Sequence, residues 1–130
     1  METTHSNIRI LIVDDEPNIV LAIEFLTKQA GYQVETAYNG MEALEKAAEF
    51  KPHLILLDVM MPKMDGFEVA RTLRQDEAFF NTKIIFLTAQ GTSRDKSKGY
   101  TSGADIYLTK PFDNQELMTL INEMTEFELS

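Results

Sequence analysis

The chain has 130 residues, of which 44% are hydrophobic and 25% charged, and this composition predicts a soluble globular protein with a core of its own. It contains no cysteine and only two histidines, which excludes disulfides, thiolate metal sites and a His-based zinc site. The net charge of −9 argues against nucleic acid binding by the chain alone, and the lack of an apolar run of membrane-spanning length leads us to expect no membrane partner and a cytoplasmic location.

The first third of the chain predicts a strand, a helix and a second strand. Residues 8–13 form an apolar run typical of a buried strand. The helix that follows has Pro17 near its first turn and apolar residues at helical spacing, and Gly31 ends it. Residues 33–37 predict a short second strand.

A second helix and the most apolar strand come next. We expect this helix to carry Leu44, Ala47 and Ala48 on one apolar stripe and to end before Pro52. The strand over 54–57 runs directly into a carboxylate, Asp58. A charged group so close to buried sequence is costly unless something pairs with it or uses it.

The remaining predicted elements are a helix over about 66–74, a strand over 83–88, a helix over 90–103, a strand over 105–109 and a helix from Asp113. The helix over 90–103 has three glycines and several Ser and Thr residues, all poor helix formers, so we expect it to be the least stable of the helices. The last helix begins with a capping box, because Glu116 stands three residues after Asp113.

Five strands alternating with five helices predict an α/β fold with a parallel sheet covered on both faces. We expect a flavodoxin-like, doubly wound sheet with strand order 2-1-3-4-5. No linker, internal repeat or low-complexity segment interrupts the chain, so residues 1–130 are expected to form one domain with a core over about 8–124.

Polar residues stand where four of the predicted strands end. Asp14 and Asp15 follow the first strand, Asp58 the third, Thr88 ends the fourth and Lys110 follows the fifth. In an open parallel sheet, ligands bind beyond the carboxyl ends of the strands, at the point where the strand order reverses. These side chains are therefore expected to meet in one crevice.

Three carboxylates in one crevice repel one another, and a divalent cation removes that repulsion. Ligation by oxygen atoms alone, with room for waters, suits Mg²⁺. A metal ion and an ammonium group neutralise phosphate oxygens, and a hydroxyl can donate a hydrogen bond to them. In such a site Asp58 is the expected nucleophile, forming an acyl phosphate.

Each of these residues also has an ordinary structural explanation. The acidic residues after the first strand could simply cap a helix, and Asp58 could be a cap or half of a salt bridge. Lys110 alone is most often a solvated lysine, and Thr88 in a strand reflects β-propensity. The placement of all of them at strand ends favours the functional interpretation.

Five motifs resemble those of receiver domains of two-component response regulators, in the same order and over about residues 8–124. They are Asp14-Asp15-Glu16, LLDVMMPKMDG (56–66), Leu87-Thr88-Ala89, Gly103-Ala104-Asp105 and Leu108-Thr109-Lys110-Pro111-Phe112.

The resemblance implies that Asp58 accepts a phosphoryl group from a phosphohistidine on a sensor histidine kinase or a histidine phosphotransfer protein. It also implies that Asp15, Asp58 and the backbone carbonyl of Met60 bind Mg²⁺ directly, and that Asp14 acts largely through a bound water. Lys110 would contact Asp58 before phosphorylation and a phosphoryl oxygen after it.

The same resemblance implies a switch. Thr88 would move toward the phosphoryl group and Tyr107 would follow inward, which changes the surface of the fourth helix, fifth strand and fifth helix for protein–protein signalling. The domain then slowly hydrolyses its own aspartyl phosphate, so we expect a signalling domain and not an enzyme with a separate substrate. Met60 and Gln90 occupy the positions that set the phosphoryl lifetime in the family, and a cis peptide bond is expected before Pro111.

No DNA-binding or enzymatic output sequence follows the last predicted helix. The chain is therefore expected to be either a stand-alone regulator that acts on a downstream protein target or a fragment separated from its output domain.

Three other classes of function were weighed against this one. A Mg²⁺-dependent phosphohydrolase would carry its nucleophile after the first strand, with a second Asp two residues on, which does not match the adjacent Asp14 and Asp15. A flavodoxin-type nucleotide module would need a phosphate cradle where those acidic residues stand. A pseudo-receiver that works without phosphorylation would typically lack one of the five chemical residues, and none is missing here.

Overall fold

The structure is a computed structural model that describes residues 7–89 and 105–126. Its strands are β1 (Arg9–Val13), β2 (Gln33–Ala37), β3 (Leu54–Asp58), β4 (Lys83–Thr88) and β5 (Ile106–Thr109). All neighbouring strands are parallel and the order is β2-β1-β3-β4-β5, which confirms the predicted doubly wound sheet.

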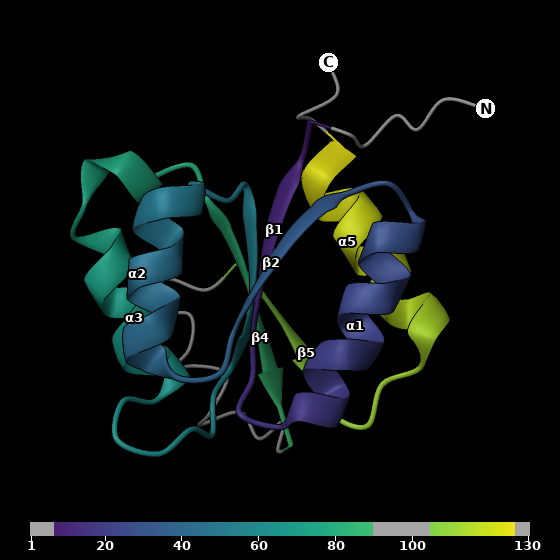
Figure 1. The fold of residues 1–130 in the computed structure, drawn as a ribbon, viewed down its shortest axis with the longest axis horizontal. Coiled ribbons are helices and arrows are strands. Elements are labelled where there is room, and N and C mark those ends of the chain that lie inside the picture. Colours follow the sequence, from purple (N-terminus) through teal and green to yellow (C-terminus); the bar gives the residue numbers. More distant parts are fainter. Residues whose placement is uncertain (1–6, 90–104, 127–130) are drawn as a thin grey trace.

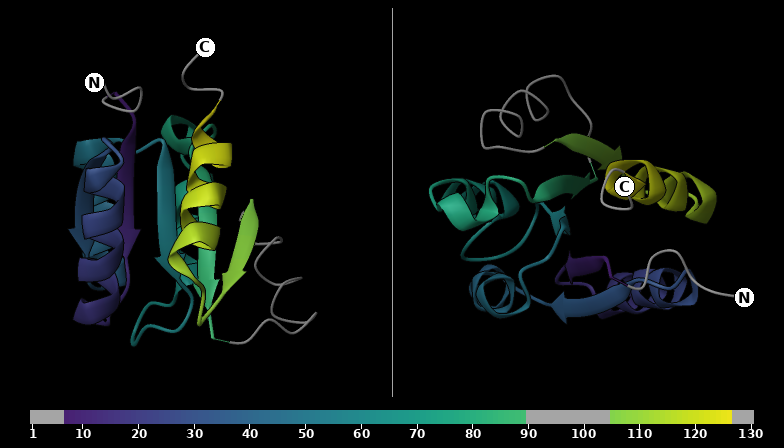
Figure 2. Two further views of the ribbon diagram at one scale, coloured as in Figure 1. Left: turned by 90° about the vertical axis from the view of Figure 1, so that its right-hand side faces the viewer. Right: turned by 90° about the horizontal axis from the view of Figure 1, so that it is seen from above.

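Helices cover both faces of the sheet (Figures 1 and 2). They are α1 (Pro17–Gln29), α2 (Gly40–Phe50), α3 (Gly66–Arg74) and α5 (Asn114–Thr125), with a short 3-10 helix η1 (Glu77–Phe79) that the sequence analysis missed. α1 and α5 lie on one face, and α2 and α3 on the other. The fourth predicted helix, over 90–103, lies outside the described residues.

β3 shows why the sheet can be covered on both faces. Successive side chains of a strand point to opposite sides, and all five residues of β3 are buried. Ile55 and Leu57 belong to the core layer under α2 and α3, whereas Leu54 and Leu56 belong to the layer under α1 and α5. A strand that is buried at every position can occupy only the middle of such a sheet.

The helix starts follow from local chemistry. Three of them begin with a side chain that accepts a hydrogen bond from a free backbone N–H of the first turn: Asn39 for α2, Asp65 for α3 and Asp113 for α5. α1 instead has Pro17 in its first turn. The chain turns after α1 at Gly31, where a φ of 100° favours glycine.

The buried stripe of α2 differs from the predicted one. Ala43 and Ala47 are buried, but Ala48 is exposed. Residues four apart share a helix face, and Ala48 lies about 100° further round the helix than Ala47, beyond the edge of the stripe.

Among the helices of the described residues, none has both the length and the hydropathy that crossing a bilayer requires.

Candidate functional site

The carboxyl ends of the strands meet along one edge of the sheet, at the bottom of Figure 1. Asp14 follows β1 there, Asp58 and Thr88 end β3 and β4, and Lys110 follows β5. Lys110 connects these elements, because its Nζ lies 2.7 Å from Asp14 Oδ2 and 3.6 Å from Asp58 Oδ1. Residues that are 96 positions apart in the chain thus form a hydrogen-bonded ion pair.

The ammonium group of Lys110 is held in its charged form. Burial lowers its pKa, but the hydrogen bond to Asp14 and the charges of Asp58, Asp14 and Glu16 outweigh burial, and the pKa is raised. The exposed Glu16 is the third carboxylate in reach, with Oε1 3.5 Å from Lys110 Nζ. A fixed cation therefore stands beside Asp58 at neutral pH.

Asp58 is only 3% exposed, and its surroundings disfavour the charged form of its carboxylate. Burial and the charge of Asp14 raise its pKa to about 7, although Lys110 and a hydrogen bond from the backbone N–H of Met60 act in the opposite direction. That N–H lies 3.3 Å from Asp58 Oδ1. The side chain of Asp15 also contacts Asp58 and raises its pKa further.

The acidic residues at this edge fit a hard divalent cation. One carboxylate oxygen from each of Asp14, Asp15 and Glu16 lies within 4.8 Å of the others, and Asp15 also contacts Asp58. Asp14 is completely buried, and the backbone N–H of Glu16 donates to its Oδ1 at 2.9 Å, which fixes the turn after β1. A donor set of oxygens with an excess of negative charge over Lys110 suits Mg²⁺.

The two residues proposed as a switch are both buried. Thr88 ends β4 and is paired in register with Thr109 of β5. The ring of Tyr107 packs edge-to-face on Phe86, with the ring centres 5.5 Å apart. The Lys110–Pro111 peptide bond is cis. Gln90, the second residue expected to tune the phosphoryl lifetime, lies outside the described residues.

Gly66 contributes to the site and was missed by the sequence analysis. It is the first residue of α3, and a Cβ atom added there would lie 2.4 Å from the backbone oxygen of Asp58. Only glycine allows α3 to approach β3 this closely. The available signal was the position of Gly66 directly after the capping residue Asp65. Glu16 was noted as part of a motif but was not predicted as a site residue.

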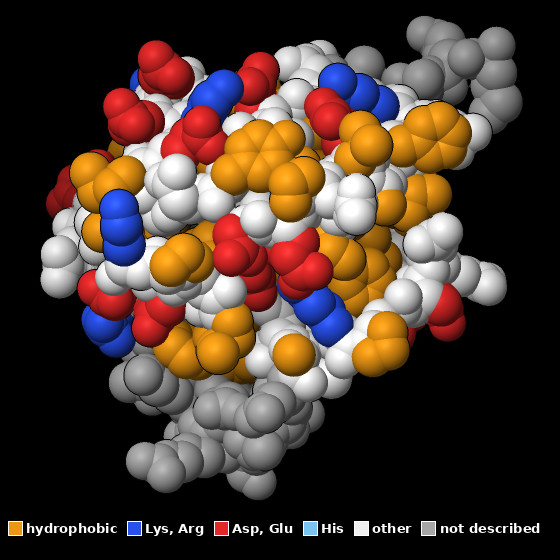
Figure 3. Space-filling model, turned by 60° about the horizontal axis from the view of Figure 1, so that its bottom comes forward, with side chains coloured by type: hydrophobic (Ala, Val, Ile, Leu, Met, Phe, Trp, Pro, Cys, Tyr) orange, Lys and Arg blue, Asp and Glu red, His pale blue; other side chains and the backbone are white. Residues whose placement is uncertain are grey.

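The surface around the acidic residues is partly apolar. Figure 3 shows acidic side chains beside a basic one near the middle of this face, with hydrophobic side chains around them. Met60 is 71% exposed, whereas its neighbour Met61 is 7% exposed. This mixture of charge and apolar surface at a site edge is suited to contact with another protein.

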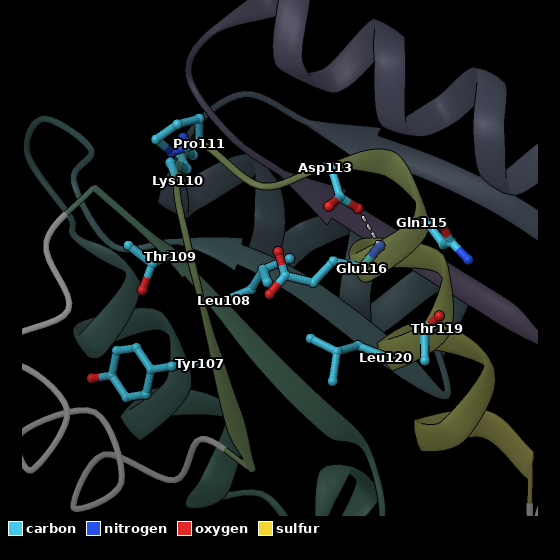
Figure 4. A pocket seen from close by; sticks show the side chains of 10 residues that line it. All are labelled: Tyr107, Leu108, Thr109, Lys110, Pro111, Asp113, Gln115, Glu116, Thr119 and Leu120. Carbon is cyan, nitrogen blue, oxygen red and sulfur yellow. Dashed lines mark hydrogen bonds between the residues drawn. The ribbon is translucent and has the colours of Figure 1, made fainter.

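Two pockets adjoin Lys110. One, of about 470 Å³, is lined by Ile19 and Ile23 of α1, by Phe112 and by Lys110 itself. The other, of about 800 Å³, lies between β5 and α5 (Figure 4). In that view Asp113 points toward the backbone N–H of Glu116, the hydrogen bond that caps α5. Lys110 and Pro111, which directly follow β5, line both pockets.

Comparison with known proteins gives one consistent result. The family model for the response regulator receiver domain matches residues 10–122. The alkaline phosphatase synthesis transcriptional regulatory protein PhoP of Bacillus subtilis is 49% identical over 111 residues, which are 85% of this chain and 45% of PhoP. The chain thus spans about half the length of such curated transcriptional regulators.

Two solved structures have the same fold. The chemotaxis protein CheY4 of Vibrio cholerae is 35% identical with a TM-score of 0.87, and the match covers 90% of this chain and 98% of CheY4. The receiver domain of the sensor histidine kinase PA1611 of Pseudomonas aeruginosa is 30% identical with a TM-score of 0.83, covering 91% and 97%. That structure has a magnesium ion coordinated in its active site cleft.

Proposed function

The chain belongs to the response regulator receiver domain family, whose members accept a phosphoryl group in two-component signalling, and on this premise we propose that Asp58 is the residue that accepts it here. The observation that carries this proposal is the contact of one buried carboxylate with both Lys110 and Asp15. A carboxylate held between a cation and further acidic oxygens is suited to attack on phosphorus once the local charge is balanced.

The proposed reaction transfers the phosphoryl group of a phosphohistidine on a sensor histidine kinase or a histidine phosphotransfer protein. An oxygen of Asp58 attacks phosphorus, the P–N bond breaks, and the imidazole leaves with the electron pair of that bond. Lys110 stabilises the negative charge on the phosphoryl oxygens, and Thr88 donates a hydrogen bond to one of them. Slow attack of water on the acyl phosphate restores Asp58 and releases inorganic phosphate, so this signalling domain resets itself.

We propose Mg²⁺ as the cofactor, held by Asp15, Asp58 and the backbone carbonyl of Met60, with Asp14 acting through a water. When bound, the ion neutralises charge on the phosphoryl oxygens and brings the phosphodonor to the carboxylate. The oxygen donors at this edge support the assignment, as does the magnesium ion of the PA1611 receiver domain. The raised pKa of Asp58 is a further support, because it shows that the site favours added positive charge.

The proposed output is a change in the surface around β5 and α5 that a downstream protein or an attached output domain recognises. Thr88, at the end of β4, and Tyr107, on β5, are the proposed switch residues, and Met60 and Gln90 the residues that tune the phosphoryl lifetime. The pocket between β5 and α5 adjoins both Tyr107 and Lys110, which supports a connection between the site and this surface. We place the signalling cycle in the cytoplasm and assign no role in it to nucleic acid binding or to a membrane.

A mass measurement tests this function. Acetyl phosphate with Mg²⁺ should add one phosphoryl group, mapped to Asp58, and hydroxylamine should remove it. Asp58→Asn should abolish the label, whereas the matched change Asp65→Asn at the start of α3 should leave it intact, because Asn also caps a helix. A label that persists in Asp58→Asn, or a rapid turnover of small phosphoesters, would contradict the proposal.

A further inference from the structure

The opposite edge of the sheet, at the amino ends of β1, β3 and β4, holds a polar pocket that the phosphoryl chemistry does not use. The pocket has a volume of about 280 Å³, and its polar lining is made by Arg9, Lys51, His53, Asn81 and Thr82. We propose that it binds a small phosphate-type oxyanion, as free phosphate or as a small phosphate ester. This inference is independent of the proposed role of Asp58.

Two cations of this pocket have no carboxylate partner. In the part of the chain that the structure describes, neither Arg9 nor Lys51 forms an ion pair. Arg9 uses its Nε to donate to the backbone oxygens of Phe50 and Lys51, at 2.9 and 3.0 Å. Its two terminal nitrogens have no hydrogen bond to the described residues, and they form the fork that matches an oxyanion.

The pocket is built around backbone contacts that hold its donors in place. His53 Nδ1 accepts a hydrogen bond from the backbone N–H of Arg9 at 3.0 Å, which fixes the ring beside the start of β1. Thr82 Oγ1 donates to the backbone oxygen of Pro52 at 3.2 Å, which ties the residue before β4 to the segment between α2 and β3. The site is therefore preorganised by the same contacts that start the strands.

Charge and size select the class of ligand. The chain has a net charge of −9, yet no acidic residue lines this pocket. Arg9 and Lys51 give this part of an acidic chain a locally positive potential, which attracts an anion. The volume is just below the range of about 300–1,000 Å³ typical of pockets for drug-sized ligands, which favours a small oxyanion over a nucleotide.

Titrations followed by NMR test the proposal on the whole chain in Mg²⁺-free buffer. Phosphate and glycerol phosphate should each shift the backbone amides of Arg9, Lys51 and His53 saturably, while chloride at equal ionic strength should not. The tighter of the two ligands identifies the natural source as free phosphate or an ester. The amide of Met60 reports binding at the other edge of the sheet and should not move in parallel.

Two lysines provide a matched pair of variants. Lys51 and Lys63 are both exposed and both have positive φ, 52° and 69°, but only Lys51 lines the pocket. Asn tolerates this backbone conformation, so Lys51→Asn and Lys63→Asn remove the same charge without strain. Lys51→Asn should weaken binding about tenfold, and Lys63→Asn should leave it unchanged.

Three results would overturn the inference. They are shifts that grow linearly without saturation, equal shifts with chloride and phosphate, and equal losses of affinity in the two variants. Arg9→Gln gives a second check, because it removes the guanidinium fork while the Lys51 amide still reports binding. Affinity that is unchanged in Arg9→Gln would also exclude the site.

Discussion

At the scale of single residues, the site depends on how Asp58 is buried. β3 brings this carboxylate to the sheet edge with 3% exposure, and its nearest cation, Lys110, is shared with Asp14 and Glu16. Burial and the charge of Asp14 therefore outweigh the attraction of Lys110, and the pKa of Asp58 rises to about 7. The ionised form of this carboxylate therefore lowers folding stability, and the proposed Mg²⁺ would offset that loss.

The first prediction concerns the stability of the metal-free protein against pH. The pKa of Asp58 is raised from 3.8 to about 7 on folding, so the native state keeps a proton that the unfolded chain loses between these values. The free energy of unfolding should fall as pH rises through this window, by about 1.4 kcal/mol for each unit of the shift. The Asp58→Asn variant has no titrating group at this position. At pH 8 this variant should therefore be more stable than the wild type by about a few kcal/mol, as the size of the pKa shift implies.

Urea denaturation of both proteins at pH 5 and pH 8 measures this difference. The advantage of Asp58→Asn should grow with pH in metal-free buffer and shrink when Mg²⁺ is added. A constant difference at the two pH values would mean that Asp58 is not the group that titrates.

The second prediction compares two glycines, Gly66 and Gly40, which are each the first residue of a helix. Gly66→Ala places a Cβ 2.4 Å from the backbone oxygen of Asp58, which cannot move without shifting β3. Gly40→Ala meets only the side chain of Met64, at 2.8–2.9 Å, and this chain can rotate away. We expect Gly66→Ala to destabilise the fold by about 1–3 kcal/mol and Gly40→Ala by less.

Chemical denaturation gives both values, and the rate of labelling by acetyl phosphate should fall in Gly66→Ala. Equal losses of stability, with labelling unaffected, would mean that the approach of α3 to β3 does not position Asp58.

At the scale of elements, α5 depends on its cap and on the apolar face it presents to the sheet. Leu117 and Ile121 are fully buried in the core layer shared with α1. Its far end is fixed to the turn before β2, because the hydroxyl of Tyr32 donates to Asn122 Oδ1 at 2.5 Å. The near end starts at Asp113, three residues after Lys110, so the start of α5 and the site share one short segment.

The third prediction tests that start. Asp113 Oδ1 accepts a hydrogen bond from the backbone N–H of Glu116 at 2.6 Å. Asp113→Ala should lower the free energy of unfolding by about 1 kcal/mol, and Asp113→Asn, which keeps the acceptor, by much less. Denaturant titration distinguishes them. Equal losses for Ala and Asn would indicate that the negative charge at the helix start matters, and not the cap.

At the scale of the whole molecule, the doubly wound sheet brings Asp14, Asp15 and Asp58 to one edge and places Arg9 and Lys51, which form no ion pair with the described residues, at the other. Strand β3 spans the two, from the polar pocket at His53 to Asp58. The described core layers on either side of it consist of buried apolar side chains. A ligand that binds at either edge would therefore add to the stability of the folded state by mass action.

The fourth prediction is that Mg²⁺ raises the thermal midpoint. A ligand that binds only the native state adds about 2.7 kcal/mol at a concentration of 100 Kd, so the midpoint should rise by several degrees as Mg²⁺ increases. Asp15→Asn removes an exposed oxygen ligand and should abolish most of the rise, while the exposed Asp76→Asn, which keeps the cap of η1, should retain it. A thermal midpoint that does not change with Mg²⁺ concentration would exclude the proposed metal site.

Much of this architecture was predictable because it depends on local pattern. Apolar runs predicted the five strands. Once the strand order was assumed, the polar residues that follow these runs predicted which edge of the sheet holds the site. Gly31 and Asp113 marked a turn and a helix start for reasons confined to a few neighbouring residues. The prediction that Ala48 lies on the buried stripe of α2 was wrong. A stripe on a short helix is a few residues wide, and the neighbouring sheet, not the helix itself, sets its edge.

The amino-acid sequence by itself determined which polar residues stand at the strand ends, and it predicted that the strands bring them to one edge. Only the tertiary structure decided how close each carboxylate lies to the ammonium group of Lys110. Asp14 is nearer to it than Asp58, and Glu16 is also within reach. The tertiary structure also decided that α3 touches the backbone of Asp58 through Gly66 and that Arg9, Lys51 and His53 share a pocket. The physical reason is that electrostatic energy and close contact depend on distances between atoms far apart in the chain, and sequence patterns record only neighbours.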